Sequence, residues 1–244
     1  MTSSRFYLDA ELTAGVPVVL PAAVTHHAAR VLRLRDGATI TAFNGRGGEW
    51  RCRLDVEGAR AWAVPQDFDP VERESQLQLA LIQAWVASDK LEWTVEKAVE
   101  LGVAELILVP AARSVIQLDE PRRQRRLTRL QEIVTAACCQ SGRNRLPGIT
   151  SATSLERGLA MALATGGRGL LLDPHARETL PDHLPESSAV AVAIGPEGGF
   201  DEAECAVAVR LGYRPTRLGP RILRTETAGV AALAALQMLG GGLR

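Results

Sequence analysis

The stretch "AVAVAIGPEGGFDEAE", residues 189–204, joins an apolar run to a glycine-rich turn and then to an acidic segment. The apolar run predicts a buried strand, which the turn at residues 195–199 must end. Asp201 followed by Glu204 has the spacing of a capping box, so a helix is expected to begin there. A strand followed by a helix in this way is typical of an α/β protein with a parallel sheet.

The glycine turn, Gly195-Pro196-Glu197-Gly198-Gly199, does not fit the common phosphate loops. It lacks the G-x-G-x-x-G spacing of dinucleotide folds and the Gly-Lys-Ser/Thr of the P-loop. Glu197 would also repel a phosphate. Glycines allow the backbone to approach a ligand closely, and S-adenosylmethionine, with an adenine, a ribose and a positive sulfur, suits such a loop. The alternative is a purely structural turn between strand and helix.

Strand and helix patterns alternate through most of the chain after residue 76, which predicts a parallel sheet covered on both faces. Ser88 is a candidate N-cap and Gly102 a candidate C-cap of the first of these helices. The expected strands cover residues 77–85, 104–110, 168–174, 189–195 and 216–219, and the expected helices cover 88–102, 121–142, 154–167, 201–212 and 225–239.

The first seventy residues have a different pattern, with short β-prone runs and one short helix at residues 25–34. Residues 38–58 predict a hairpin around the turn Asn44–Gly48. A small β-barrel over residues 1–70 and a larger α/β domain over residues 75–244 are therefore expected, joined by the polar segment 67–76.

Composition excludes several classes of protein. Lysine and arginine together number 28, and so do aspartate and glutamate, so any nucleic-acid site must be a local patch. The four cysteines form no C-x-x-C pair, and no metal site is expected. The N-terminus does not read as a secretion signal and no apolar run is long enough to cross a membrane, so a cytoplasmic protein is expected.

A second motif, "LGPRILRTETA" at residues 218–228, follows the glycine turn in the chain. Together the two motifs resemble the 16S ribosomal RNA (uracil-N3) methyltransferase family, a branch of the knotted SPOUT methyltransferases. The segments at residues 25–37, 89–114 and 140–147 match the same family. One departure is Cys139, which stands where the family usually has a glutamate.

The resemblance implies a PUA-like N-terminal barrel, a deep trefoil knot in the C-terminal sheet, and a homodimer. It also implies S-adenosylmethionine as cofactor, held by three loops. The residues expected to bind it are Leu172, Gly195, Pro196, Glu197, Gly198, Gly199, Leu218, Gly219, Ile222, Leu223 and Thr227.

The reaction implied is methylation of N3 of the uridine at position 1498 of 16S ribosomal RNA in the small (30S) subunit. Arg224 would stabilise charge on the uracil and Glu226 would accept a proton or position the ribose, unless the two merely pair with each other and order the turn. Glu197 would contact the cofactor or the RNA, or would cap the next helix with its carboxylate. The alternatives are another SPOUT RNA methyltransferase, acting on a ribose 2′-hydroxyl of tRNA or rRNA, and an RNA-binding assembly factor without catalysis.

RNA contacts require local positive charge, which arginine supplies at several places. The arginines expected to contact RNA are Arg30, Arg33 and Arg35 of the first domain, and Arg143 and Arg145 of the central motif. The arginine-rich run at residues 122–129 either contacts RNA as well or is a solvated helix face.

Overall fold

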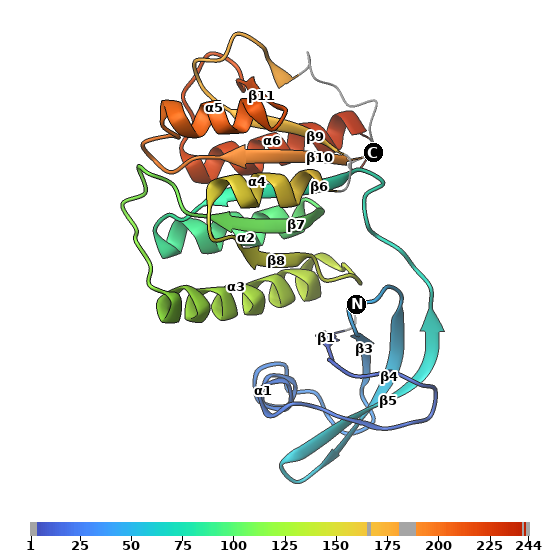
Figure 1. Cartoon of the computed structure of the whole chain (residues 1–244). Coiled ribbons are helices and arrows are strands. Elements are labelled where there is room, and N and C mark those ends of the chain that lie inside the picture. Colours follow the sequence, from blue (N-terminus) through green and yellow to red (C-terminus); the bar gives the residue numbers. More distant parts are fainter. Residues whose placement is uncertain (1–3, 165–166, 181–188, 241, 243–244) are drawn as a thin grey trace. The chain divides into compact units, whose positions relative to one another are not determined.

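The computed structural model describes residues 4–164, 167–180, 189–240 and 242, and the chain divides into two compact units (Figure 1). One unit comprises Met1–Glu74 with Cys138–Leu146, and the other comprises Ser75–Ala137 with Pro147–Arg244. Residues 165 and 166, near the expected end of a helix, lie outside the described residues.

The N-terminal unit is built on a five-stranded sheet in the order β1-β3-β4-β5-β2. The predicted hairpin is present, because β3 and β4 pair antiparallel with Thr39 opposite Arg53. A bulge follows Arg51, where β5 contains Pro65, as expected for a residue that cannot donate to the ladder. The elements are β1 (Arg5–Tyr7), β2 (Val18–Val19), helix α1 (Ala22–His26) continuing into a π-helical turn (His27–Val31), β3 (Thr39–Phe43), β4 (Glu49–Glu57) and β5 (Arg60–Asp69).

The second unit contains a six-stranded sheet in the order β11-β9-β10-β6-β7-β8, and every pairing in it is parallel. This confirms the predicted parallel α/β architecture. All six residues of β10 are buried, as the uninterrupted apolar run predicts. The strands are β6 (Gln78–Ala84), β7 (Val103–Val109), β8 (Gly148–Ser151), β9 (Arg168–Leu172), β10 (Ala189–Ile194) and β11 (Tyr213–Thr216).

Helices cover both faces of this sheet (Figure 1). Helices α2 and α6 contact each other and pack on one face, against β7 and β10, while α4 and α5 pack on the other face. The helices are α2 (Ser88–Glu100), α3 (Glu120–Ser141), α4 (Leu155–Leu163), α5 (Glu202–Arg210) and α6 (Thr225–Gly240).

The caps of these helices partly follow the sequence. The capping box of α5 is confirmed, because Asp201 Oδ1 accepts from the Glu204 amide at 2.8 Å and Glu204 Oε2 accepts from the Asp201 amide at 2.9 Å. The prediction for Gly102 is off by one position, since Leu101 is the C-cap of α2 and Gly102 follows it with φ at +79°. The prediction for Ser88 is wrong, since Ala87 is the N-cap and Ser88 is already helical.

Two strands differ from the prediction. The last strand lies at Tyr213–Thr216 rather than at residues 216–219. The proline at position 215 argues against a strand there, but β11 is an edge strand, where a residue without an N–H is tolerated. Strand β8, at Gly148–Ser151, follows the central motif and was not predicted. The shift of β11 matters for the site, because it leaves residues 217–224 free as a loop at the carboxyl end of the sheet.

Candidate functional site

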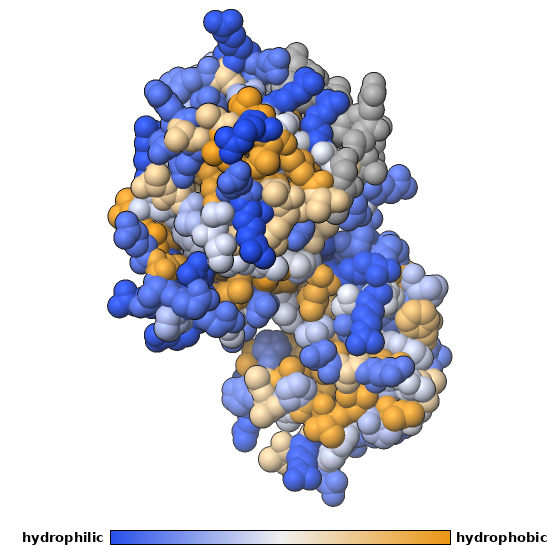
Figure 2. Space-filling view, viewed as in Figure 1, coloured by the Kyte–Doolittle hydropathy of each residue, from blue (hydrophilic) through white to orange (hydrophobic). Residues whose placement is uncertain are grey.

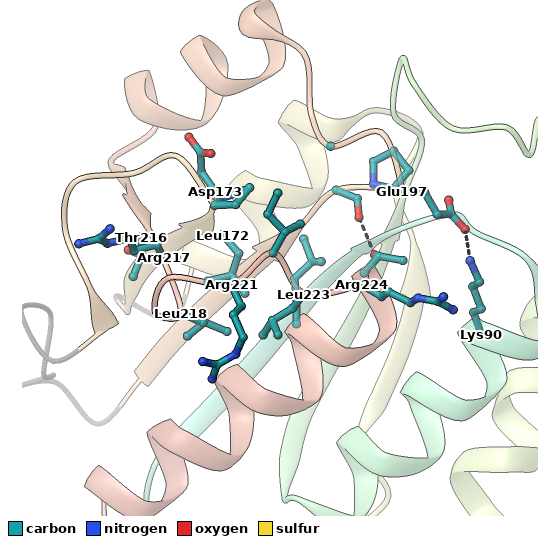
Figure 3. A pocket seen from close by; sticks show the side chains of 18 residues that line it. Lys90, Leu172, Asp173, Glu197, Thr216, Arg217, Leu218, Arg221, Leu223 and Arg224 are labelled. Carbon is teal, nitrogen blue, oxygen red and sulfur yellow. Dashed lines mark hydrogen bonds and ion pairs between the residues drawn. The ribbon is translucent and has the colours of Figure 1, made fainter.

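A cavity of about 410 Å³ lies at the carboxyl ends of β9, β10 and β11 (Figure 3). These strands lie side by side in the sheet, in the order β11-β9-β10, so the loops that follow them meet at one edge. The loop after β9 contributes Leu172 and Asp173, and the glycine loop after β10 contributes Gly195, Pro196, Glu197 and Gly199. The loop after β11 leads into α6 and closes the cavity.

Most of the residues expected to bind cofactor line this cavity: Leu172, Gly195, Pro196, Glu197, Gly199, Leu218, Ile222 and Leu223. Three others, Gly198, Gly219 and Thr227, are not among its lining residues. The structure also adds residues that the sequence did not single out, namely Lys90, Asp173, Pro174, Ile194, Thr216, Arg217, Arg221, Thr225 and Ala228.

The glycines of the loop have different structural roles. A side chain at Gly195 would place its Cβ 2.7 Å from the Phe200 nitrogen and 2.9 Å from the Gly199 carbonyl carbon, so the fold of the turn excludes one. Gly199 has φ at +69°, which favours glycine. The Gly198 carbonyl oxygen accepts a hydrogen bond from Arg113 Nη1 at 3.1 Å, which holds the loop from its outer side.

Thr225, the first residue of α6, holds the glycine loop from inside. It is only 6% exposed, and its Oγ1 donates to the Gly195 carbonyl oxygen at 2.7 Å. The Thr225 hydroxyl in turn accepts a hydrogen bond from Gln83 Nε2 of β6 at 3.1 Å. Gln83 belongs to no recognisable motif. The one signal in the sequence is that it is a polar residue within the apolar run at residues 77–85. The chain of contacts ties β6, the glycine loop and α6 into one rigid wall.

Charged groups gather at the rim of the cavity. Lys90 Nζ lies 2.9 Å from Glu197 Oε1, and both side chains line the cavity (Figure 3). The hydrogen bond from Lys90 holds the pKa of the Glu197 carboxyl below its ordinary value, and the same bond raises the pKa of the Lys90 ammonium. Four cationic side chains and two carboxylates line the cavity, so its electrostatic field favours an anionic partner.

The two predicted catalytic residues are placed differently. Arg224 lines the cavity, whereas Glu226 does not. No ion pair joins Arg224 to Glu226 in the described part of the chain. The two residues therefore do not order the turn by pairing with each other, which was the alternative to a catalytic role. Glu226 Oε2 is buried without a hydrogen-bond partner, and its charge acts on Lys90. This carboxylate oxygen therefore has a free hydrogen-bonding position.

The predicted RNA contacts in the N-terminal unit fall into two groups. Arg30, Arg33 and Arg35 are exposed and make no ion pair within the described part of the chain. Arg33 adopts φ at +54°, a strained conformation for a residue with a side chain. These three side chains are free to meet a phosphate.

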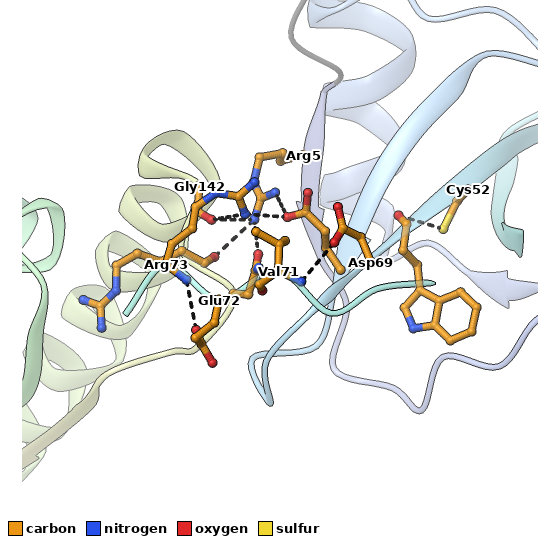
Figure 4. Close-up of polar contacts among 11 residues, drawn as sticks. Arg5, Cys52, Asp69, Val71, Glu72, Arg73 and Gly142 are labelled. Atoms are coloured by element: carbon orange, nitrogen blue, oxygen red, sulfur yellow. Dashed lines mark hydrogen bonds and ion pairs between the residues drawn. The ribbon is translucent and has the colours of Figure 1, made fainter. Parts of the chain in front are cut away.

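Arg143 and Arg145 are already engaged. Arg143 is 5% exposed and pairs with Glu74 through two hydrogen bonds, and Arg145 Nε donates to Glu72 Oε2 at 2.7 Å. In the same cluster Arg5 donates to the carbonyl oxygens of Gly142 and Arg143 (Figure 4). In this arrangement the two arginines hold the segment Cys138–Leu146 within the N-terminal unit, and Arg143 has no face open to RNA.

Cys139, which departs from the family pattern, lies in this cluster next to Tyr7 and Arg5, and burial raises the pKa of its thiol. Burial also raises the pKa of the Cys138 thiol to about 12. Both thiols therefore stay protonated at neutral pH. Among the described residues, no group of histidine, cysteine and acidic side chains could hold a metal ion, and none of the described helices could cross a membrane.

Each of the two units matches a known protein family. A model of the RNA methyltransferase domain matches residues 73–237, and a model of the RNA methyltransferase PUA domain matches residues 20–60. The chain is 31% identical to proteins named ribosomal RNA small subunit methyltransferase E. For the protein of Mycobacterium tuberculosis the match covers 98% of this chain and 93% of the relative, and for that of Bacillus subtilis 86% of each.

Solved structures resemble the chain over almost its whole length. Ribosomal RNA small subunit methyltransferase E from Neisseria gonorrhoeae, bound to S-adenosylmethionine, is 37% identical with a TM-score of 0.90. A putative methyltransferase from Legionella pneumophila, in complex with the same cofactor, is 31% identical with a TM-score of 0.92. Each comparison covers 98% of both chains.

Proposed function

The chain belongs to the family of RNA methyltransferases named ribosomal RNA small subunit methyltransferase E, and we propose that it methylates N3 of the uridine at position 1498 of 16S ribosomal RNA with S-adenosylmethionine. The observation that supports this most is the cavity that three loops build at the carboxyl ends of β9, β10 and β11. In this proposal the enzyme works in the cytoplasm and acts on the 30S subunit.

The residues of the cavity suit this cofactor. A volume of about 410 Å³ lies within the range of small-molecule sites. Leu172, Leu218 and Leu223 offer apolar walls for an adenine, and the backbone of the glycine loop offers hydrogen-bond groups for its edge. The carboxylate of Asp173 suits ribose hydroxyls. When bound, S-adenosylmethionine supplies an electrophilic methyl group on a positively charged sulfur.

The residues of the chain must make the uridine N3 nucleophilic. N3 carries a proton at neutral pH, and its loss leaves negative charge spread over the uracil oxygens. Lys90 and Arg224, both at the cavity, stabilise this charge. Glu226, two residues after Arg224, is the proposed proton acceptor; its buried Oε2 has no other partner and lies within electrostatic range of Lys90, and it must become accessible when the uridine binds.

Glu197 has a distinct role in this mechanism. Its carboxylate holds the Lys90 ammonium by a 2.9 Å contact and thereby keeps a flexible side chain at the cavity. Glu197 is thus a positioning residue for Lys90, in addition to its place in the cofactor wall. Because the target N3 lies on the Watson–Crick edge, the uridine must be unpaired or flipped to reach these groups.

The remaining family features are part of the same proposal. The C-terminal segment forms a deep trefoil knot around the cofactor, and the enzyme acts as a homodimer. The packed helices α2 and α6 support a dimer, because they carry exposed apolar side chains at Trp93, Met238 and Leu239. The N-terminal unit binds RNA through Arg30, Arg33 and Arg35, which lie within the region that the PUA model matches.

The test uses 30S subunits from a strain that lacks the gene, incubated with the purified protein and labelled S-adenosylmethionine. We expect one methyl group on N3 of a single uridine, located by mass spectrometry of nuclease fragments. Label on a ribose 2′-hydroxyl would establish the other SPOUT reaction instead. Binding of RNA without any label, and without cofactor binding in calorimetry, would establish an assembly factor.

A further inference from the structure

A second hollow of about 440 Å³ lies away from the cofactor cavity, between the β7–α3 loop and the first turns of α3. Its walls are Val115–Leu118 on one side and Arg122, Arg125 and Arg126 on the other. We call this surface the arginine groove. Hydrophilic side chains gather over the N-terminal end of α3, with apolar ones beside them (Figure 2).

The arginines of α3 differ in how far their charge is neutralised. Arg123 pairs with Glu120 at 2.7 Å, and Arg129 pairs with Glu132 at 3.1 Å and with Glu92 at 3.5 Å. Arg122 has a looser partner, since its Nε lies 3.8 Å from Asp119 Oδ2. The arginines that are well neutralised are therefore not those that line the groove.

Arg125 and Arg126 make no ion pair among the described residues. Arg125 Nε donates to the Pro121 carbonyl oxygen at 3.3 Å, and Arg126 Nη1 donates to that of Val86 at 3.3 Å. A carbonyl fixes the direction of a guanidinium without cancelling its charge. Two full positive charges thus remain at the groove, held in place and available to an anion.

The opposite wall of the groove is mostly apolar, and the exposed Gln117 is the one polar side chain among Val115–Leu118. Val115 is 85% exposed, and Ile116 and Leu118 are partly buried beside it. A surface that pairs fixed guanidinium groups with exposed aliphatic side chains matches unpaired nucleotides, because phosphates bind arginine and an unstacked base covers an apolar or guanidinium surface. The charge complementarity favours RNA as the occupant.

The arginine groove lies on the same edge of the sheet as the cofactor cavity. Arg113 of the β7–α3 loop donates to Gly198 of the glycine loop, and Ser114 Oγ donates to the Trp85 carbonyl oxygen at the end of β6. Arg126 reaches Val86 of the β6–α2 loop, four residues before Lys90 of the cavity rim. A strand of RNA that enters the cavity can therefore continue along this edge.

We propose that the arginine groove binds the single-stranded RNA that flanks the nucleotide being methylated, with phosphates on Arg125, Arg126 and the loosely paired Arg122 and an unstacked base against Val115. This inference rests on the proposed function for the identity of the nucleic acid. The arginine groove belongs to the methyltransferase unit and not to the N-terminal unit. It would select an unpaired substrate strand.

The test is the double variant Arg122→Gln/Arg125→Gln, in which both side chains are exposed and neither lines the cofactor cavity. Its matched control is Arg157→Gln/Arg210→Gln, which removes the same charge from exposed positions of α4 and α5. Binding of a fluorescent single-stranded fragment of 16S RNA that contains the target uridine is measured by anisotropy, without cofactor, from 50 to 200 mM salt.

We expect the groove variant to bind the RNA about tenfold more weakly, and the slope of log affinity against log salt to fall by about 1.4, since each single-strand phosphate contact contributes about 0.7. The control variant should match the wild type in both. In methyl transfer, the groove variant should raise the KM for RNA and leave kcat and cofactor affinity unchanged. Val115→Ser should weaken RNA binding without changing the salt slope.

Equal affinities and slopes for the groove and control variants would overturn the inference. The proposed function is tested separately. A wild type that binds RNA through the groove and transfers no methyl group would refute the enzyme assignment and leave the groove established.

Discussion

The Lys90 ammonium lies 2.9 Å from a carboxylate oxygen of Glu197, and this contact joins α2 to the glycine loop across 107 positions of the chain. Because the pKa of Glu197 is lowered by the bond and that of Lys90 is raised, acid disrupts the contact only below the lowered pKa of the carboxyl, and alkali only above the raised pKa of the ammonium. Both groups are charged throughout the neutral range, so Lys90 presents a constant cation to the cavity.

The first prediction concerns the pH dependence of methyl transfer. A cation next to the uracil favours its deprotonated form, so Lys90→Met should raise the apparent pKa of the reacting base and shift the rise of kcat by about one unit toward higher pH. Glu197→Gln should shift it in the same direction but less, because the Lys90 ammonium is then no longer held at the cavity by a carboxylate. Lys90→Arg serves as the control that retains the cation.

Single-turnover rates at saturating RNA, measured from pH 6 to 9.5, provide the comparison. Superimposable pH profiles for the wild type and Lys90→Met would show that Lys90 acts on structure rather than on the charge of the base.

The second prediction concerns Thr225. Thr225→Val removes the hydrogen bond to the Gly195 carbonyl oxygen and leaves this buried acceptor without that partner, which costs about 1–3 kcal/mol of stability. The glycine loop should loosen and cofactor affinity should fall about tenfold. Thr227→Val is the matched control, because Thr227 is exposed and does not line the cavity.

Urea unfolding and cofactor calorimetry measure the two effects. If Thr227→Val weakened cofactor binding as much as Thr225→Val, the cofactor would extend beyond the cavity described here, as the sequence alone suggested.

The third prediction separates two glycines of the same loop. Gly195→Ala should abolish cofactor binding, since its Cβ would meet backbone atoms 2.7 and 2.9 Å away that cannot move without opening the turn. Gly198→Ala should be tolerated better, because its nearest neighbour is the Arg113 side chain at 3.2 Å. Calorimetry with S-adenosylmethionine measures cofactor affinity for both variants. An equal loss of affinity in the two would contradict the prediction that only Gly195 is sterically required.

The fourth prediction concerns Arg143. Arg143→Met leaves the largely buried Glu74 without this partner, and breaking a buried pair typically costs about 3–5 kcal/mol, with the lower end expected here. We therefore expect a marked loss of stability in chemical denaturation. Arg30→Gln/Arg33→Gln should lower RNA affinity and leave stability unchanged, since both side chains are exposed. A stable Arg143→Met protein with reduced RNA affinity would restore Arg143 as a direct RNA contact.

The fifth prediction tests the dimer. Trp93 is 42% exposed on α2, where a charge would be harmless in a monomer but costly in an apolar interface. Trp93→Glu should convert the protein to a folded monomer in sedimentation and reduce methyl transfer. Val209→Glu, at an exposed apolar position of α5 on the other face of the sheet, is the control. Equal masses for the two variants would argue against α2 as the interface.

Local patterns in the sequence were enough to predict the parallel α/β unit, the hairpin and the capped start of α5. These features depend on residues close together in the chain, such as Asp201 with Glu204, whose spacing alone sets their contact. The sequence also identified the glycine loop and the segment before α6, because each one follows the end of an expected strand and precedes the start of an expected helix. The two motifs carried the family resemblance that the comparisons confirm.

The tertiary structure decided which residues face the same cavity. The strand order β11-β9-β10-β6 brings Asp173, Glu197 and Lys90 to one edge, and no local pattern dictates that order. It also turned Arg143 from an expected RNA contact into a buried partner of Glu74. A charged residue looks alike in sequence whether solvated or buried, because its environment is made by segments far away in the chain. The sequence alone therefore determined the elements and the loop chemistry, while the folded sheet determined which charges meet.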